Sequence, residues 1–301
     1  MVLKPPKIVL FGRDGQVGTA LLPGLEELGT VVPVDVGDVD LTDRKLVESF
    51  LERHSPSLIV NAAAYTNVDG AETARDLAFT LNAEAPGVMA TWAAAHGAAL
   101  VHYSTDYVFD GSGSKPHSEE NPTAPLNVYG ESKLTGDREI LKSGCAHLIF
   151  RTSWVYAPRG KNFVLTMLRL GREKEELRVV NDQIGAPTSA KVVADGTVRI
   201  LRSCGGDVSG RLWESGGLYN LTCRGETSWF GLAEAIFAAC RARGWQLALK
   251  RLIPVGSEEY RTPAKRPKNS RLDLRKIEKQ FGLVPLSWKQ ALDGCLNEIE
   301  K

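Results

Sequence analysis

The sequence predicts an α/β fold: a doubly wound parallel sheet with a smaller second α/β domain beside it. Short apolar runs alternate with helix-like stretches through the first half of the 301 residues, and strands that alternate with helices form parallel sheets covered on both faces. A glycine-punctuated turn follows the first apolar run, between Gly12 and Gly18. The second half changes to shorter and less regular elements, which indicates a separate, smaller domain.

The first half reads as five strands with helices between them. Right-handed crossovers between such strands give a sheet wound in both directions. The expected strands are 7–12, 31–36, 57–64, 99–109 and 147–156. The expected helices are 17–29, 43–54, 69–96 and one that begins near Val128.

The second half carries amphipathic helical patterns, and Ser228 stands where a helix N-cap is expected. We predict a first domain over 1–151 and a second domain over mainly 152–301, with the helix around 188–203 returning to the first. The expected helices are 162–174, 189–203, 228–244, 275–282 and 287–301, and the expected strand is 217–223.

Composition narrows the class of protein. Apolar residues make up 43% and charged residues 24%, and 37 basic residues against 36 acidic ones give a net charge of +1. This balance argues against nucleic acid or a membrane surface as the main partner. No apolar run is long enough to span a bilayer, and the first residues run directly into a strand pattern, so we expect a cytoplasmic protein.

Cysteine and histidine usage gives no sign of a metal site. The five cysteines are widely spaced without a CxxC pair, which argues against disulfides and structural zinc. The five histidines form no spaced cluster. We therefore assign no metal-ligating residue.

The turn after the first strand has the pattern G-x-x-G-x-x-G, with Gly12 and Gly15 followed by Gln16 and Val17 at the start of a helix. Any tight turn can be rich in glycine. Here the turn lies between a strand and a helix of a βαβ unit, where glycines let the backbone approach a pyrophosphate and the helix N-terminus donates amides. The pattern predicts a dinucleotide-binding Rossmann domain.

Asp35, at the end of the second strand, is placed to bind an adenosine ribose. A carboxylate there favours NADH over NADPH, because it repels a 2′-phosphate. Arg13 in the glycine turn has the opposite effect if it meets that phosphate, although it is equally well explained as a solvent-facing arginine. The choice between NADH and NADPH stays open.

Two further strand ends carry candidate site residues. After the third strand, Ala62, Ala63 and Ala64 have little bulk, which suits either a flat ligand or close helix packing. The residues that follow them at the carboxyl edge of the sheet, where such folds bind ligands, are Tyr65, Thr66 and Val68. After the fourth strand come Ser104, Thr105 and Asp106, which suit a turn as well as a site.

Tyr129 and Lys133 are four residues apart and so share one face of the helix that begins near Val128. Such a pair arises by chance in many helices. Its place after Thr105, in a chain that also has the glycine turn and Asp35, makes chance a poor explanation.

These features together resemble the extended branch of the short-chain dehydrogenase/reductase superfamily. The stretches "FGRDGQVG", "NAAAYTNVDGAE", "YSTDYVFDG", "PLNVYGESKLTGD", "FRTSWVY", "NDQIGAPT" and "RPKNSRLD" resemble the dTDP-4-dehydrorhamnose reductase family. The resemblance implies an NAD(P)H-dependent reductase of a nucleotide-sugar, which makes dTDP-L-rhamnose for surface polysaccharides. It implies that the second domain binds substrate. It implies cofactor contacts from Gly15, Gln16, Val17, Asp35, Asp40, Leu41, Ala64, Tyr65 and Thr66.

The resemblance also assigns catalytic roles. Tyr129 is the expected proton donor, and Thr105, Asp106 and Trp154 are expected to meet the substrate. A free tyrosine has a pKa of about 10, and we expect a Lys133 ammonium to lower the pKa of Tyr129 and to bind the cofactor ribose. Trp154 suits a core aromatic equally well.

For the substrate diphosphate we expect Arg266 and Lys268, on charge alone. Some members of the family bind magnesium at a subunit contact. Lys191 stands where an acidic ligand is expected, so magnesium dependence and a homodimer built on it stay open.

Two other functions compete with a reductase. A related dehydratase needs an Asp-Glu pair after the threonine, whereas here Tyr107 follows Asp106; a related epimerase would show no net turnover of added NAD(P)H. A non-catalytic, dinucleotide-binding regulatory subunit is the alternative from another class, and the complete set of Thr105, Tyr129 and Lys133 argues against it.

Overall fold

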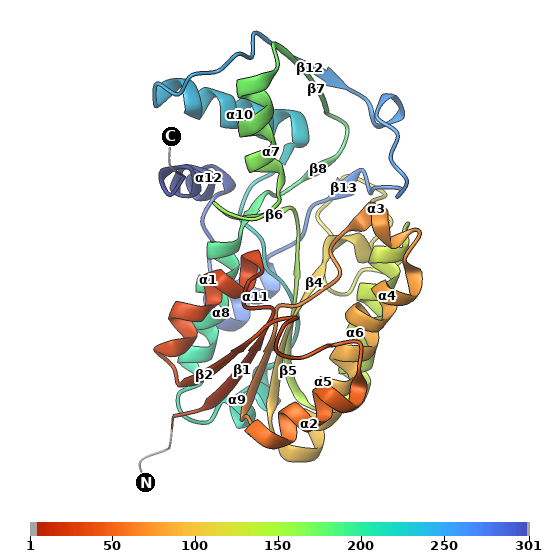
Figure 1. The fold of residues 1–301 in the computed structure, drawn as a ribbon, viewed down its shortest axis with the longest axis vertical. Helices are drawn as coiled ribbons and strands as arrows, with labels where there is room; N and C mark the ends of the chain where they lie inside the picture. The colour runs from red at the N-terminus through yellow and green to blue at the C-terminus, as the bar shows by residue number, and fades with distance from the viewer. Residues whose placement is uncertain (1–4, 300–301) are drawn as a thin grey trace.

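A six-stranded parallel sheet forms the centre of the computed structural model, which describes residues 5–299 (Figure 1). The strand order is β10-β5-β4-β3-β1-β2, so the chain winds outward from β1 in both directions. The predicted doubly wound α/β class is confirmed. The strands are β1 (Lys7–Phe11), β2 (Thr30–Val34), β3 (Leu58–Asn61), β4 (Ala99–Thr105), β5 (Ala146–Thr152) and β10 (Gly217–Asn220).

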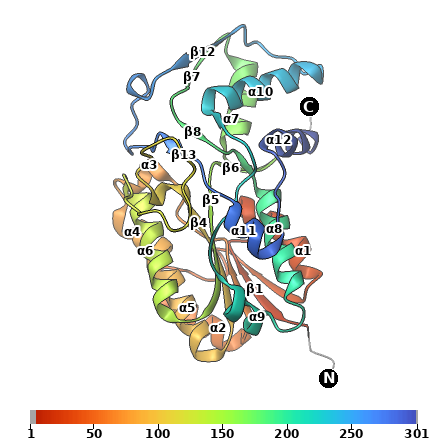
Figure 2. The ribbon, with the colours of Figure 1, turned by 180° about the vertical axis from the view of Figure 1, so that it is seen from behind.

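Helices cover both faces of this sheet (Figures 1 and 2). Leu10, Val101 and Phe150 belong to the core on the face of α1 and α8, whereas Val9 and Ile149 belong to the core on the opposite face. The helices of the first face are α1 (Gln16–Glu26), α8 (Ala190–Ser203), α9 (Val208–Ser215) and α11 (Arg275–Phe281). Those of the second face are α2 (Arg44–His54), α5 (Ala85–His96) and α6 (Val128–Ser143).

A second hydrophobic core lies beyond the carboxyl ends of the strands (Figure 1). It is built around Val164, Leu232, Phe237 and Leu292, from α7 (Phe163–Glu173), α10 (Trp229–Ala242) and α12 (Trp288–Asn297). Short strand pairs surround it: β7 (Glu176–Val180) with β12 (Arg251–Val255), β6 (Val155–Tyr156) with β9 (Thr188–Ser189), and β8 (Ile184–Gly185) between β11 (Thr227–Ser228) and β13 (Asn269–Ser270). The domain boundary at residue 151 stays a prediction. β10 belongs to the sheet and α8, α9 and α11 pack on it, although all four come from the later half of the sequence.

The predicted helix 69–96 is wrong in one respect, because the chain is broken there into several pieces. These are α3 (Val68–Ala71), α4 (Arg75–Phe79), a π turn η1 (Thr80–Glu84) and α5. Ala74 leaves the helical region, with φ −115° and ψ 47°. The π turn directs Asn82 inward, where its amide bonds both backbone polar groups of Tyr65 at 2.8 and 3.0 Å. Such turns occur where a side chain must be re-aimed.

The helix starts follow their caps. Asn127 accepts the Gly130 N–H and begins α6 at Val128, and Ser228 accepts the Gly231 N–H and begins α10, as predicted. The strands β7 and β12 and the helix α9 were not predicted. They are short, and β7 and β12 are polar at their first residues.

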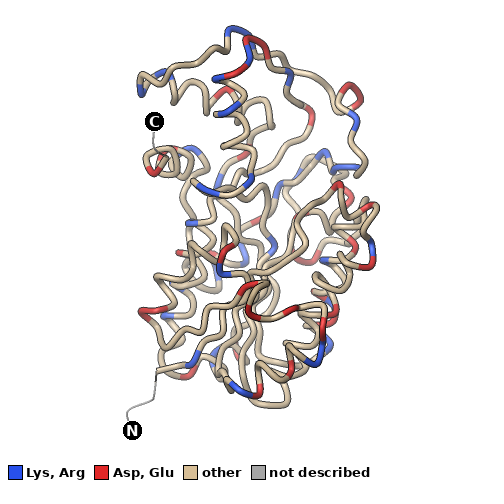
Figure 3. Tube along the Cα trace, viewed as in Figure 1, with Lys and Arg blue, Asp and Glu red and all other residues tan. Residues whose placement is uncertain are grey.

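Several properties of the described residues bear on the class of protein. The five cysteines are buried, free thiols. No helix within residues 5–299 has both the length and the apolar content that a membrane crossing requires. Acidic and basic residues are interspersed over the whole trace in Figure 3, which fits the balanced net charge.

Candidate active site

The glycine turn makes a cradle with no space for side chains. Gly12 has φ +77°, and a Cβ there would lie 2.5 Å from the Ala63 nitrogen; a Cβ on Gly18 would lie 1.9 Å from the Gly12 oxygen. Gly15 precedes α1 without any side-chain cap. The first amides of α1 are therefore left for a ligand, as in a phosphate site at a helix N-terminus.

An acidic corner adjoins this turn at the end of β2. The Asp35 carboxylate accepts the Asp14 N–H at 2.9 Å and the Val36 N–H at 2.8 Å. Arg13 lies close by, but its guanidinium pairs with Asp38 at 3.1 Å and with Asp14 at 3.4 Å. Arg13 is thus already paired with two carboxylates, whereas Asp35 has no ion-pair partner within residues 5–299.

A cleft of about 600 Å³ runs from this corner across the carboxyl edge of the sheet. It joins the glycine turn to the residues predicted for catalysis. The predicted residues that line it are Gly12, Gly15, Gln16, Val17, Asp35, Ala64, Thr66, Thr105, Asp106, Tyr129, Lys133 and Trp154. Six segments of the chain that are distant in sequence therefore meet in one cavity.

Tyr129 and Thr105 face each other at the inner end of the cleft. The Thr105 hydroxyl donates to Asp106 Oδ1 at 3.2 Å and accepts the Tyr107 N–H at 3.1 Å, so its position is fixed. The ring of Tyr107 packs edge-on against Tyr129 at 5.9 Å. Burial raises the pKa of Tyr129, and the Thr105 hydroxyl opposes the rise.

Lowering of the Tyr129 pKa by Lys133 stays a prediction. A buried histidine that was not predicted adjoins Lys133. The Lys133 ammonium nitrogen lies 3.0 Å from His102 Nε2, and His102 Nδ1 lies 3.2 Å from Asn61 Nδ2. Lys133 is only 1% exposed and His102 is fully buried. Burial lowers the pKa of Lys133 to about 8, although the Asp137 carboxylate opposes this.

A buried ion pair lies beneath these groups. Asp137 Oδ2 accepts the Ser104 hydroxyl at 2.9 Å and lies 3.4 Å from Arg151 Nε. Neither Asp137 nor Arg151 is more than 4% exposed. This pair fixes α6 against β4 and β5, and so fixes the face that presents Tyr129 and Lys133.

Asp106 is 2% exposed, and its Oδ2 has no hydrogen-bond partner within residues 5–299. Burial raises its pKa to about 7, and the Ser270 and Thr105 hydroxyls oppose the rise. A buried carboxyl with a free oxygen beside Tyr129 is suited to receive a hydroxyl group of a ligand.

The raised pKa of Asp106 predicts a pH-dependent effect of Asp106→Asn on stability. An acid whose pKa rises from 3.8 to about 7 on folding destabilises the protein as it ionises, so the cost grows between these pH values. We expect the variant and the wild type to unfold alike near pH 4. At pH 8 the variant should be more stable by at least about 1 kcal/mol. Urea unfolding at both pH values measures this; an equal gain at pH 4 would contradict the assignment.

Trp154 forms the wall of the cleft toward the second core. It adopts a left-handed backbone with φ +50°, which is rare for a bulky residue and concentrates at functional sites. Its indole stacks on Trp229 at 3.7 Å with an interplanar angle of 13°. The ring is thus both packed on one face and open to the cleft on the other.

Some predicted residues lie outside the lining of this cleft. Asp40 caps the turn before α2 by accepting from Thr42, and Leu41 packs beside the core under α2. Tyr65 and Val68 follow the strand end without lining the cleft. Arg266 lines a neighbouring cavity of about 270 Å³ and forms a bidentate pair with Asp69, and Lys268 pairs with Asp182 at 3.1 Å.

The sequence analysis missed the loop that follows β6. Arg159, Gly160 and Lys161 line the cleft, and Asn162 donates to the Gln16 side chain at 2.8 Å, which ties this loop to the glycine turn. Within the described chain, neither Arg159 nor Lys161 has an acidic partner within 4.0 Å. The signal was present as "PRGKN", a basic turn directly after a strand pattern.

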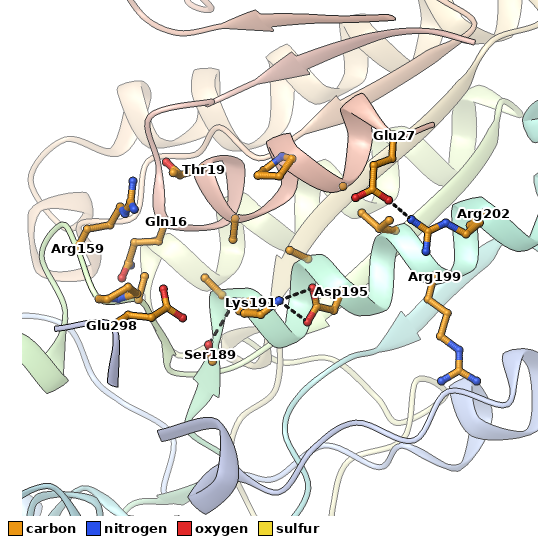
Figure 4. A pocket seen from close by; sticks show the side chains of 18 residues that line it. Gln16, Thr19, Glu27, Arg159, Ser189, Lys191, Asp195, Arg199, Arg202 and Glu298 are labelled. Carbon is orange, nitrogen blue, oxygen red and sulfur yellow. Dashed lines mark hydrogen bonds and ion pairs between the residues drawn. The ribbon is translucent and has the colours of Figure 1, made fainter. Parts of the chain in front are cut away.

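Lys191 lies in a second cavity, of about 580 Å³, between α1 and α8 (Figure 4). Its ammonium binds both Asp195 carboxylate oxygens, at 3.0 and 2.9 Å, and Glu27 pairs with Arg202 on the same wall. Among residues 5–299 there is no group of three or more His, Cys, Asp or Glu side chains that could hold a metal. Two acidic groups of this cavity, Asp195 and Glu27, are instead paired with Lys191 and Arg202.

The sequence is similar to one known family and to several known proteins. Residues 6–301 match the family described as RmlD substrate binding domain. The chain is 43% identical to dTDP-4-dehydrorhamnose reductase of Burkholderia thailandensis over 295 residues, covering 97% of this chain and 99% of that one. It is 44% identical to that of Escherichia coli K12, covering 97% of each chain.

Solved structures agree with these relatives. The crystal structure of a dTDP-4-dehydrorhamnose reductase from Clostridium acetobutylicum superposes with a TM-score of 0.89 at 34% identity, covering 97% of this chain and 98% of that one. The one from Bacillus anthracis, in complex with NADP, gives 0.87 at 33% identity, covering 97% and 99%.

Proposed function

The chain belongs to the dTDP-4-dehydrorhamnose reductase family, and we propose from this premise that it reduces the C4 keto group of dTDP-4-dehydro-6-deoxy-L-mannose to give dTDP-L-rhamnose. It is an NAD(P)H-dependent oxidoreductase of the extended short-chain type. The observation that carries the proposal is the meeting of the glycine cradle with Thr105, Tyr129 and Lys133 in one cleft. We propose that it acts in the cytoplasm, in polysaccharide biosynthesis.

The cradle fits the dinucleotide that this reaction needs. Positions 12 and 18 exclude any side chain, the first amides of α1 have no side-chain cap, and Arg159 and Lys161 supply positive charge opposite the turn. We propose that these residues hold the diphosphate and that Asp35 holds the adenosine ribose. When bound, the reduced nicotinamide supplies a hydride to the sugar carbon.

The remaining chemistry belongs to the side chains of this protein. Reduction leaves an alkoxide at C4, and the Tyr129 hydroxyl is the acid that protonates it. The Tyr107 N–H holds the Thr105 oxygen in place. On substrate binding the Thr105 hydroxyl turns its proton from Asp106 Oδ1 to the reacting oxygen, which it orients toward Tyr129. Since burial raises the pKa of Tyr129, the phenolate left behind needs a nearby cation, and Lys133 is the side chain placed to provide it.

The function is tested by supplying the 4-keto-L-sugar to the purified protein and following NADH or NADPH oxidation, with and without EDTA. We expect substrate-dependent oxidation and dTDP-L-rhamnose as product. An epimerase would return isomerised keto sugar without net oxidation, and a regulatory subunit would bind cofactor without turnover. Either outcome would overturn the proposal. A homodimer remains a prediction, which sedimentation equilibrium of the protein tests.

The acidic corner predicts a preference for NADH over NADPH. Asp35 lines the cleft without an ion-pair partner among residues 5–299, whereas Arg13 is paired with Asp38 and Asp14. A 2′-phosphate would face this carboxylate without a free cation, so we expect NADPH to bind at least about tenfold more weakly, equivalent to about 1.4 kcal/mol. Fluorescence titration of the protein with each nucleotide gives both dissociation constants.

Asp35→Ser is the variant that tests this preference, and Glu48→Gln on the exposed face of α2 is its matched control. The first should bring the two dissociation constants within about threefold of each other, which is less than 1 kcal/mol. The second should leave their ratio unchanged. Equal affinities for both nucleotides in the wild type would contradict the prediction.

A further inference from the structure

His102 occupies a central place under the catalytic helix that the proposed reaction does not explain. It lies on β4, in register with Asn61 on β3, and both side chains are buried on the face that α6 covers. One ring nitrogen lies 3.0 Å from Lys133 Nζ and the other lies 3.2 Å from Asn61 Nδ2. The imidazole therefore connects the sheet to Lys133.

The hydrogen bonds that link Asn61, His102 and Lys133 have a fixed direction. Asn61 Oδ1 accepts the Ala63 backbone N–H at 3.1 Å, and a backbone amide can only donate. The Asn61 amide is thereby oriented, and its Nδ2 donates to His102 Nδ1. Since Nδ1 is the acceptor, a neutral imidazole carries its proton on Nε2.

This tautomer affects the charge of Lys133. An Nε2–H can donate a hydrogen bond to the lone pair of an uncharged amine. Opposite an ammonium, both groups are donors and no hydrogen bond can form. Protonating Lys133 therefore requires the imidazole proton to move from Nε2 to Nδ1 and the Asn61 amide to turn over, which breaks its bond with Ala63. Burial acts in the same direction, because it lowers the pKa of Lys133 to about 8 and lowers the pKa of His102.

The other charged groups near the Asn61–His102–Lys133 hydrogen bonds affect the charge of Lys133 less directly. Asp137, one turn after Lys133, favours the ammonium, but its carboxylate is shared with Ser104 and Arg151. The titratable or charged groups that face these hydrogen bonds are Tyr129 and Asp137 on α6, Asp106 just after β4 and Arg151 on β5. Asn61 and Ser104 are its polar neighbours on β3 and β4.

We propose that His102 is a positioning residue, which acts through the Asn61–His102–Lys133 hydrogen-bond chain to set whether Lys133 carries a proton. These hydrogen bonds make Lys133 lose its proton more readily, because its ammonium is formed only as the imidazole proton shifts to Nδ1 and the Asn61 amide turns over. The consequence for catalysis rests on the proposed reductase function, in which the Lys133 ammonium stabilises the Tyr129 phenolate.

The tautomer is tested on the protein alone, by long-range 1H–15N NMR of 15N-histidine-labelled protein at about pH 10, well above the pKa of about 8 that burial gives Lys133. We expect one buried histidine, absent from the spectrum of His102→Gln, to be neutral with its proton on Nε2. If that variant does not fold, single substitutions of the other four histidines assign the signal by elimination. A proton on Nδ1, or an imidazolium, would overturn the proposal whatever the enzyme does.

The charge of Lys133 is read by the pH titration of its Cε resonance in 13C-lysine-labelled protein. In His102→Gln the side-chain carbonyl can accept from an ammonium, so we expect the Lys133 midpoint to rise by about one pH unit, a tenfold change that corresponds to one hydrogen bond. Asn61→Asp should raise it as well, because a carboxylate accepts from Nδ1–H and frees Nε2 as an acceptor. His147→Gln, whose ring bonds only the Cys145 carbonyl, is the matched control and should not move it.

The reductase pH profile gives the same information through catalysis. Activity should fall as Lys133 loses its proton, and the alkaline limb of kcat should move up with the Lys133 midpoint in His102→Gln and Asn61→Asp. A midpoint that stays in place or moves down in both variants would overturn the proposal. If the NMR results hold and the protein reduces no sugar, the proposed function fails and this inference stands.

Discussion

Tyr129→Phe is expected to lower kcat for sugar reduction by about 10³-fold, within the range by which a positioned general acid accelerates a reaction. The variant keeps the ring that packs against Tyr107 and removes only the hydroxyl. Steady-state NADH oxidation with the 4-keto sugar measures the loss.

Nucleotide binding separates a chemical role from a structural one. Because Tyr129 lies at the inner end of the cleft, away from the Asp35 corner, we expect the NADH dissociation constant of Tyr129→Phe to stay within about twofold, less than 0.5 kcal/mol. Tyr107→Phe removes a hydroxyl from the neighbouring ring and should keep most activity. If Tyr129→Phe turns over at nearly the wild-type rate, Tyr129 is not the proton donor.

The sheet could be predicted because its strands and helices leave local signals. Strands such as "KIVLF" are buried on both faces and so read as apolar runs, and Asn127 and Ser228 mark helix starts by their own hydrogen bonds. The break inside 69–96 left a weaker signal. Ala74 and the π turn at Thr80–Glu84 follow from the contacts of Asn82 with Tyr65 and Ser132, which are distant in sequence.

The candidate site was predictable where its residues follow strand ends in order along the chain. Gly12, Asp35 and Thr105 were predicted on that basis, and Tyr129 from its spacing to Lys133 and from the family resemblance; the structure brings all four together. The partners of Lys133 could not be predicted, because the contact with His102 depends on how α6 lies across β4. For the same reason Arg266, chosen for its charge, proved to be bound to Asp69, while Arg159 and Lys161 were missed.

The buried pair of Asp137 and Arg151 predicts the largest effect on stability. Asp137→Ala leaves the Arg151 guanidinium, 4% exposed, without its carboxylate, and leaves the Ser104 hydroxyl without an acceptor. Removing one partner of a buried ion pair costs about 3–5 kcal/mol, because the remaining charge is uncompensated. Urea unfolding of the variant at pH 7 should show a loss of that size.

Two further variants test whether this loss of stability comes from the buried Arg151 charge that is left without its partner. Ser104→Ala removes one hydrogen bond and should cost about 1 kcal/mol. Adding Arg151→Met to Asp137→Ala should recover much of the stability, because an apolar replacement of a whole buried pair is often close to neutral. A double variant less stable than Asp137→Ala alone would mean that Arg151 stabilises the fold mainly by packing over Phe109, 5.2 Å away.

The same double variant also tests how the Asp137–Arg151 pair affects the pKa of Lys133. Asp137 raises the pKa of Lys133 against the effect of burial. Its removal together with Arg151 should therefore lower the titration midpoint of Lys133, opposite to the rise expected for His102→Gln. Opposite shifts in two variants that both change buried polar groups next to Lys133 cannot come from general loosening of the site. They would show that Lys133 is tuned between Asp137, which favours its proton, and His102, which opposes it.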